Sequence, residues 1–158
     1  MAEKKAGLRI KPHHLVDIIS SFARKDIEFK PHPFGHAVHV VAETVFNNPD
    51  VEFNIELGAD TICYPCKYNV NNFCIDTIDT SFRPLAPESK NEWNLLIDRR
   101  WCRKLGVKQG DLFTARQFCR ILREKAKDIS GIYRELPEEM IKKKEKSIEE
   151  GAKAFMER

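Results

Sequence analysis

Three cysteines lie close together in the middle of the chain, in the segment ADTICYPCKYNVNNFCID at residues 59–76. Two residues separate Cys63 from Cys66, and seven separate Cys66 from Cys74. Thiolates are soft, charged donors that suit Zn²⁺ and the irons of iron–sulfur clusters better than oxygen donors do. Pro65 stiffens the first pair, and the Asn-rich run before Cys74 tolerates a turn that returns the third thiol. The spacing therefore predicts a metal centre in a short, turn-rich loop.

A redox dithiol is the alternative interpretation of the Cys63 and Cys66 pair, with Cys74 as a bystander. Such a motif is expected to open a helix directly after a strand, within a larger α/β pattern that this sequence does not show. The chain has five cysteines, an odd number, which argues against a framework of structural disulfides. We interpret Cys102 and Cys119 as buried core thiols, although Cys102 is also a rival candidate for a metal ligand.

A fourth ligand must come from elsewhere, and the segment KPHHLVD at residues 11–17 offers candidates. His13, His14 and Asp17 lie at the start of a predicted helix, where His13 and Asp17 share a face. Adjacent histidines at a helix start are typically solvated when they occur alone. The three cysteines elsewhere in the chain are what make at least one of these histidines a candidate for the same site.

These motifs resemble a small family of bacterial and archaeal proteins, domain-of-unknown-function family 1284. Its members begin with Arg-Pro-His-His-Leu-Leu-Cys and continue to Gly-x-Asp-Asp-Ile-Cys-x-x-Cys-Pro and a third loop cysteine. Here LRIKPHHLVD, ADTICYPC and Cys74 are similar to those motifs, and LGVKQGD at 105–111 is similar to the family's Leu-Gly-x-x-x-Gly-Asp. The resemblance covers residues 8–125 and implies an iron–sulfur cluster on the three loop cysteines. It implies no established activity.

One position departs from the family, because Asp17 stands where its members usually have a cysteine. The resemblance then implies a [4Fe–4S] cluster on Cys63, Cys66 and Cys74, with Asp17, His14 or Cys102 as the fourth ligand. A carboxylate on one iron is more exchangeable than a thiolate and would leave that iron open to a substrate. In such an enzyme His13 or His14 would transfer protons. The alternative is a zinc-stabilised binding module without catalysis.

Three further histidines, His32, His36 and His39, lie in the segment KPHPFGHAVH. On a helix His36 and His39 would be neighbours. They could form a second metal site or a proton-transfer face beside the cluster. The simpler interpretation is a polar edge of an otherwise apolar helix, because Glu43 is the nearest acid on that face.

Short regular elements must bring these residues together. Alternating apolar residues predict a strand over 51–57 that leads into the cysteine loop, and LRI at 8–10 predicts another. SKNE at 89–92 and TARQ at 114–117 are helix-capping patterns. Apolar residues at helical spacing predict five helices, which begin near Pro12, Phe34, Ser89, Thr114 and Pro137.

The length of 158 residues suits one domain with its own core. We predict a small, mostly helical α+β domain over residues 1–135, in which a short sheet carries the cysteine loop. Residues 136–158 form a charged C-terminal helix with a thin apolar stripe. We expect this helix to dock weakly or to pair with a second copy of the chain in a homo-oligomer.

Charge and composition limit the partners. The chain carries 27 basic and 24 acidic residues, and this near balance argues against nucleic acid as a partner. No apolar run approaches the roughly 20 residues of a membrane span, and the N-terminus lacks the apolar region of a signal peptide, so we expect a cytoplasmic protein. The common phosphate-loop, dinucleotide, hydrolase and zinc-protease motifs are missing. A redox protein or a small-molecule substrate is the partner we expect, and whether the protein is an enzyme stays open.

Overall fold

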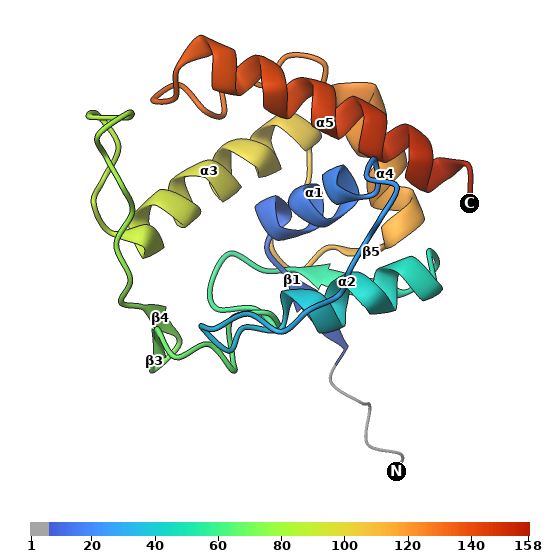
Figure 1. Cartoon of the computed structure of the whole chain (residues 1–158), viewed down its shortest axis with the longest axis horizontal. Coiled ribbons are helices and arrows are strands. Elements are labelled where there is room, and N and C mark those ends of the chain that lie inside the picture. Colours follow the sequence, from blue (N-terminus) through green and yellow to red (C-terminus); the bar gives the residue numbers. More distant parts are fainter. Residues whose placement is uncertain (1–6) are drawn as a thin grey trace.

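A three-stranded mixed sheet joins the first strand of the chain to two later segments (Figure 1). In this computed structural model, β1 (Leu8–Ile10) pairs in parallel with β2 (Glu52–Ile55), and β2 pairs antiparallel with β5 (Leu112–Thr114). Phe53 and Ile55 are buried, whereas the residues between and before them are not, as the period of two predicted. The strand predicted at 8–10 is confirmed, and the strand predicted at 51–57 is confirmed over Glu52–Ile55.

The helices pack beside this sheet. They are α1 (Pro12–Ser21), α2 (Val38–Asn47), α3 (Lys90–Leu105), α4 (Ala115–Lys125) and α5 (Glu138–Met156). The Ser89 hydroxyl accepts from the backbone N–H of Glu92 at the start of α3, and Thr114 and Gln117 form a capping box at the start of α4. Both predicted caps are confirmed.

The second helix begins four residues later than the predicted start at Phe34. Gly35 has a φ of 79°, in the left-handed region, so the chain cannot be in a right-handed helix there. The segment before Val38 is therefore a turn, and α2 contains His39 but not His36. The predicted helix is confirmed, but its predicted start is wrong.

The last helix packs across α1 and α4 and belongs to the same core (Figure 1). Ala152 and Phe155 are fully buried, and the Phe155 ring stacks on Phe22 with 5.4 Å between the ring centroids. The expectation of a weakly docked helix is wrong, because small residues let this narrow stripe approach α1 closely. The described chain thus forms one mostly helical α+β domain.

Gly151 of α5 sets this close approach, and we expect Gly151→Ala to lower the free energy of unfolding by about 2 kcal/mol. A β-carbon there would lie 2.6 Å from the Cα of Ser20 and would overlap the carbonyl oxygen of Ile19. Gly131→Ala is the matched control, because no atom of the described chain beyond its immediate neighbours in sequence lies within 4 Å of the added carbon. Chemical denaturation measures both. A Gly151→Ala protein as stable as the original would contradict the tight packing of α5 on α1.

The structure describes residues 7–158. The first six residues belong to the N-terminal stretch on which the expected lack of a signal peptide rests, and they lie outside the described part. Within residues 7–158, no helix combines the length and the apolar character that crossing a membrane requires.

Candidate metal centre

The three loop cysteines are brought together by a small hairpin. Strands β3 (Asn69–Val70) and β4 (Phe73–Cys74) pair antiparallel, with Asn69 opposite Cys74. The turn between them places Asn71 and Asn72 at positive φ values of 52° and 65°, which asparagine tolerates better than most residues. The Asn-rich run thus reverses the chain, as the sequence predicted, and returns Cys74 towards Cys66.

Cys63, Cys66 and Cys74 line one cavity of about 30 Å³. All three are partly buried, and none is in a disulfide. Lys11 and Asn69 also line this cavity, and the buried Oδ1 of Asn69 has no hydrogen-bond partner among residues 7–158. The three thiols therefore line one cavity, as their spacing predicted, although they do not form a group within 4.8 Å in residues 7–158.

Asp60 connects this loop to the start of α1. Its carboxylate is fully buried and accepts hydrogen bonds from the backbone N–H of Lys11 at 2.8 Å and of Cys63 at 2.9 Å. It also lies 2.7 Å from Nδ1 of His14. Burial opposes ionisation, but the contact with His14 and the donated hydrogen bonds outweigh it and lower the pKa of Asp60. Asp60 is therefore an ionised acceptor.

This contact fixes the proton of His14. Because ionised Asp60 can only accept, Nδ1 of His14 carries the proton and donates it, which leaves a lone pair on Nε2. Burial, together with the neighbouring His13, lowers the pKa of His14, so the ring is neutral at pH 7. A histidine held by a carboxylate in this way presents Nε2 as a metal ligand or as a base.

His13 has a separate carboxylate partner. Both its backbone N–H and its Nδ1 lie 2.8 Å from the oxygens of Asp98, a fully buried residue of α3. Burial works against a charged ring, but Asp98 outweighs it and raises the pKa of His13. The His13 and His14 rings lie side by side, with 4.3 Å between their centroids. The two predicted histidines are therefore each oriented by a buried acid.

Within the described residues 7–158, one group of three side chains has ligand atoms that all lie within 4.8 Å of one another, and it consists of His14, Asp60 and Cys63. This group could hold a metal ion. The sequence pointed to His14 and Cys63 but missed Asp60 and also Asp98. Asp60 lies three residues before Cys63, where the family motif quoted above also has an aspartate, and this was the available signal. No sequence pattern around Asp98 indicated that it would contact His13.

None of the three candidates for the fourth ligand, His14, Asp17 and Cys102, lines the cysteine cavity itself, but His14 alone of them forms a three-residue group with Cys63 in residues 7–158. Asp17 is exposed on α1 and lines a larger cavity of about 570 Å³, together with His14, His32, His36 and His39. Cys102 is partly buried against the core, and burial raises the pKa of its thiol to about 11.

Two further thiols can be judged by their surroundings. Cys119 is fully buried, and its Sγ donates to the Ala152 carbonyl at 3.6 Å, which confirms it as a core residue. Burial and the charge of Asp60 raise the pKa of the Cys63 thiol to about 12. Reactive cysteines of dithiol redox motifs typically have a lowered pKa instead. The raised pKa of Cys63 therefore argues against the redox-dithiol interpretation.

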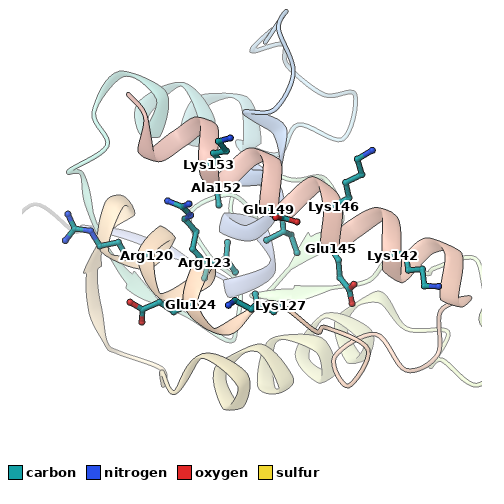
Figure 2. A pocket seen from close by; sticks show the side chains of 13 residues that line it. Arg120, Arg123, Glu124, Lys127, Lys142, Glu145, Lys146, Glu149, Ala152 and Lys153 are labelled. Carbon is teal, nitrogen blue, oxygen red and sulfur yellow. The ribbon is translucent and has the colours of Figure 1, made fainter.

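A cavity of about 960 Å³ lies between α4 and α5, and none of the candidate metal ligands lines it. Figure 2 shows charged side chains of both helices around it, and six of the lining residues are basic: Arg120, Arg123, Lys127, Lys142, Lys146 and Lys153. None of its lining residues is a cysteine or a histidine. Its chemistry is that of a solvated, charged groove rather than of a metal site.

The structure thus establishes a His, Asp and Cys group that could hold a metal, and five cysteines without a disulfide. The resemblance to domain-of-unknown-function family 1284 rests on the motifs alone. The chain matches no protein-family model, no curated protein and no solved structure.

Proposed function

We propose that the protein binds an iron–sulfur cluster, [4Fe–4S], through Cys63, Cys66 and Cys74, with His14 as the fourth ligand. The observation that carries this proposal is that three thiols line one cavity, while His14, held by Asp60 through Nδ1, forms a group with Cys63 of that cavity. A ligand atom of His14 lies within 4.8 Å of the Cys63 sulfur. The family resemblance supports iron rather than zinc.

The spacing of the donors supports a cluster over a single ion. Sulfurs bound to one tetrahedral zinc at 2.3 Å lie about 3.8 Å apart. In residues 7–158 the three loop thiols do not form a group within 4.8 Å, so a single ion would have to draw them together.

The cavity itself is about 30 Å³, little more than the space of one water molecule, so a cluster requires the loop to move outward. The two-residue strands β3 and β4 offer little resistance to that movement.

A cluster in this loop would supply an electron-transfer centre, or a Lewis acid where one iron is open. The chain's own residues would hold and move the proton. Nδ1 of His13 shares a proton with Asp98, while Asp60 keeps the neighbouring His14 in the tautomer that can bind metal. The adjacent rings therefore divide two tasks, proton transfer by His13 and ligation by His14.

A zinc-stabilised module is the second candidate, and a specific observation favours it. The compact group of His14, Asp60 and Cys63 has the dimensions of a single-ion site, and the cavity is small. In that case Asp60 would be a ligand itself rather than the residue that orients His14. The protein would then bind one zinc and carry out no redox chemistry.

Metal analysis separates the two candidates. We expect anaerobically purified protein to be brown, with broad sulfur-to-iron charge-transfer absorption and about four irons per chain. The absorption spectrum and the iron, sulfide and zinc contents measure this directly. Colourless protein with one zinc per chain would contradict the cluster and support the zinc module.

A further inference from the structure

Four of the five histidines of the chain line a single cavity of about 570 Å³ next to the proposed metal centre. His14 belongs to both sites, while His32, His36 and His39 come from the turn before α2 and from α2 itself. This volume is typical of sites that bind metabolites. Whether these histidines donate or accept hydrogen bonds decides which ligands the cavity can bind.

The hydrogen bonds of His32 and His36 define which nitrogen of each ring carries the proton. Nδ1 of His32 accepts from the Phe34 backbone N–H at 3.1 Å, and Nδ1 of His36 accepts from the Val38 backbone N–H at 3.4 Å. A ring nitrogen that accepts has a lone pair, so the proton of each neutral ring lies on Nε2. This is the opposite tautomer from that of His14, whose Nδ1 donates. His32 and His36 are therefore N–H donors and not metal ligands through Nε2.

The two rings stack, with 4.4 Å between their centroids, which keeps the two Nε2–H donors near each other. Two adjacent donors match the two oxygens of a carboxylate. Arg24 adds a cation to the lining, whereas Lys30 is paired with Glu28 at 2.7 Å. The rest of the lining includes apolar side chains that can cover a hydrocarbon body: Ile18, Ile27, Phe29, Val38 and Ala42.

We propose that this cavity binds a small organic carboxylate, whose oxygens accept from His32 and His36 and whose carbon chain packs on the apolar wall. Asp17 and Asp26 also line the cavity and would repel a polyanion, so one carboxylate group is expected. An amino group on the ligand could pair with either acid. That the carboxylate is a substrate of the metal centre rests on the proposed function, but its binding does not.

Butanoate is the probe, and nitrogen-detected NMR of the histidine rings is the measurement. We expect His32 and His36 to show the Nε2–H tautomer and to shift when butanoate is added. His32→Leu and His36→Leu should each weaken binding about tenfold, because each removes a hydrogen bond to a charged oxygen. His36→Gln, which keeps an N–H donor, should retain most of the affinity. Lys153→Leu, in the groove between α4 and α5, should change nothing.

Further ligands and one variant separate the outcomes. Tighter binding of 2-aminobutanoate than of butanoate would identify the ligand as an amino acid, and the reverse would identify a simple acid. Binding to Cys66→Ser protein should equal that of the original protein, so a failed metal proposal would leave this one standing. Absent binding of both acids, or binding by both leucine variants as tight as that of the original protein, would overturn the proposed carboxylate site.

Discussion

Serine in place of Cys66 is expected to abolish metal binding while leaving the helices folded. Cys66 supplies one of three thiols around the cavity, and a hydroxyl is a poor ligand for soft metals. We expect the fold to be independent of the loop, because the core contains large, fully buried side chains from the helices, among them Trp101, Phe118 and Phe155. Metal content should fall to background, and helical circular dichroism should stay close to that of the original protein.

Cys102→Ser is the matched control, because this thiol is partly buried but does not line the cysteine cavity. It should keep the metal. Global loss of helical signal in Cys66→Ser would place the metal among the determinants of the fold, as in a zinc module. Full metal content in Cys66→Ser would rule out the loop as the site.

The sequence predicted those parts of the fold that depend on local signals. The caps at Ser89 and Thr114 act within three residues of the chain, and both are present as expected. The start of α2 was wrong because the apolar spacing around it outweighed Gly35, whose positive φ ends the helical pattern. The glycine within this pattern of apolar residues was the sequence signal that the helix begins after it.

The burial of α5 could not be predicted from the sequence for a different reason. We predicted that its apolar stripe was too narrow for deep burial. That prediction did not allow for small residues, which let two helices pack closely. The absence of a side chain at Gly151 lets the backbones of α5 and α1 approach, and this contact joins segments more than 130 residues apart. Composition within the helix could not show which partner would meet that glycine.

In the candidate site, too, residues that are close in sequence could be predicted, and residues that meet through tertiary contact could not. The cysteine trio could be found from spacing because its members lie within one loop. Asp60 and Asp98 act on His14 and His13 across 46 and 85 residues of sequence. Their roles come from tertiary contact. The place of Asp60 three residues before Cys63 was a weak signal, and Asp98 had no signal in the sequence.

The buried acid Asp60 provides the sharpest test of the fourth ligand. We expect Asp60→Asn to weaken metal binding 10- to 100-fold, the usual effect of removing the partner that orients a ligand. The asparagine amide can donate to Nδ1 of His14, which would move the ring proton to Nε2 and block that nitrogen as a ligand. Chelator competition measures the affinity, and ring NMR reports the tautomer.

Asp98→Asn is the matched control, because Asp98 is equally buried and holds His13 in the same manner. Both substitutions should lower the free energy of unfolding, since each leaves buried donors unpaired, but Asp98→Asn should leave metal affinity unchanged. Asp17→Asn and Cys102→Ser complete the comparison. If His14 is the ligand, neither should make the metal more sensitive to chelators. Loss of metal in Asp17→Asn with full retention in Asp60→Asn would instead assign the fourth position to Asp17, as the family resemblance implies.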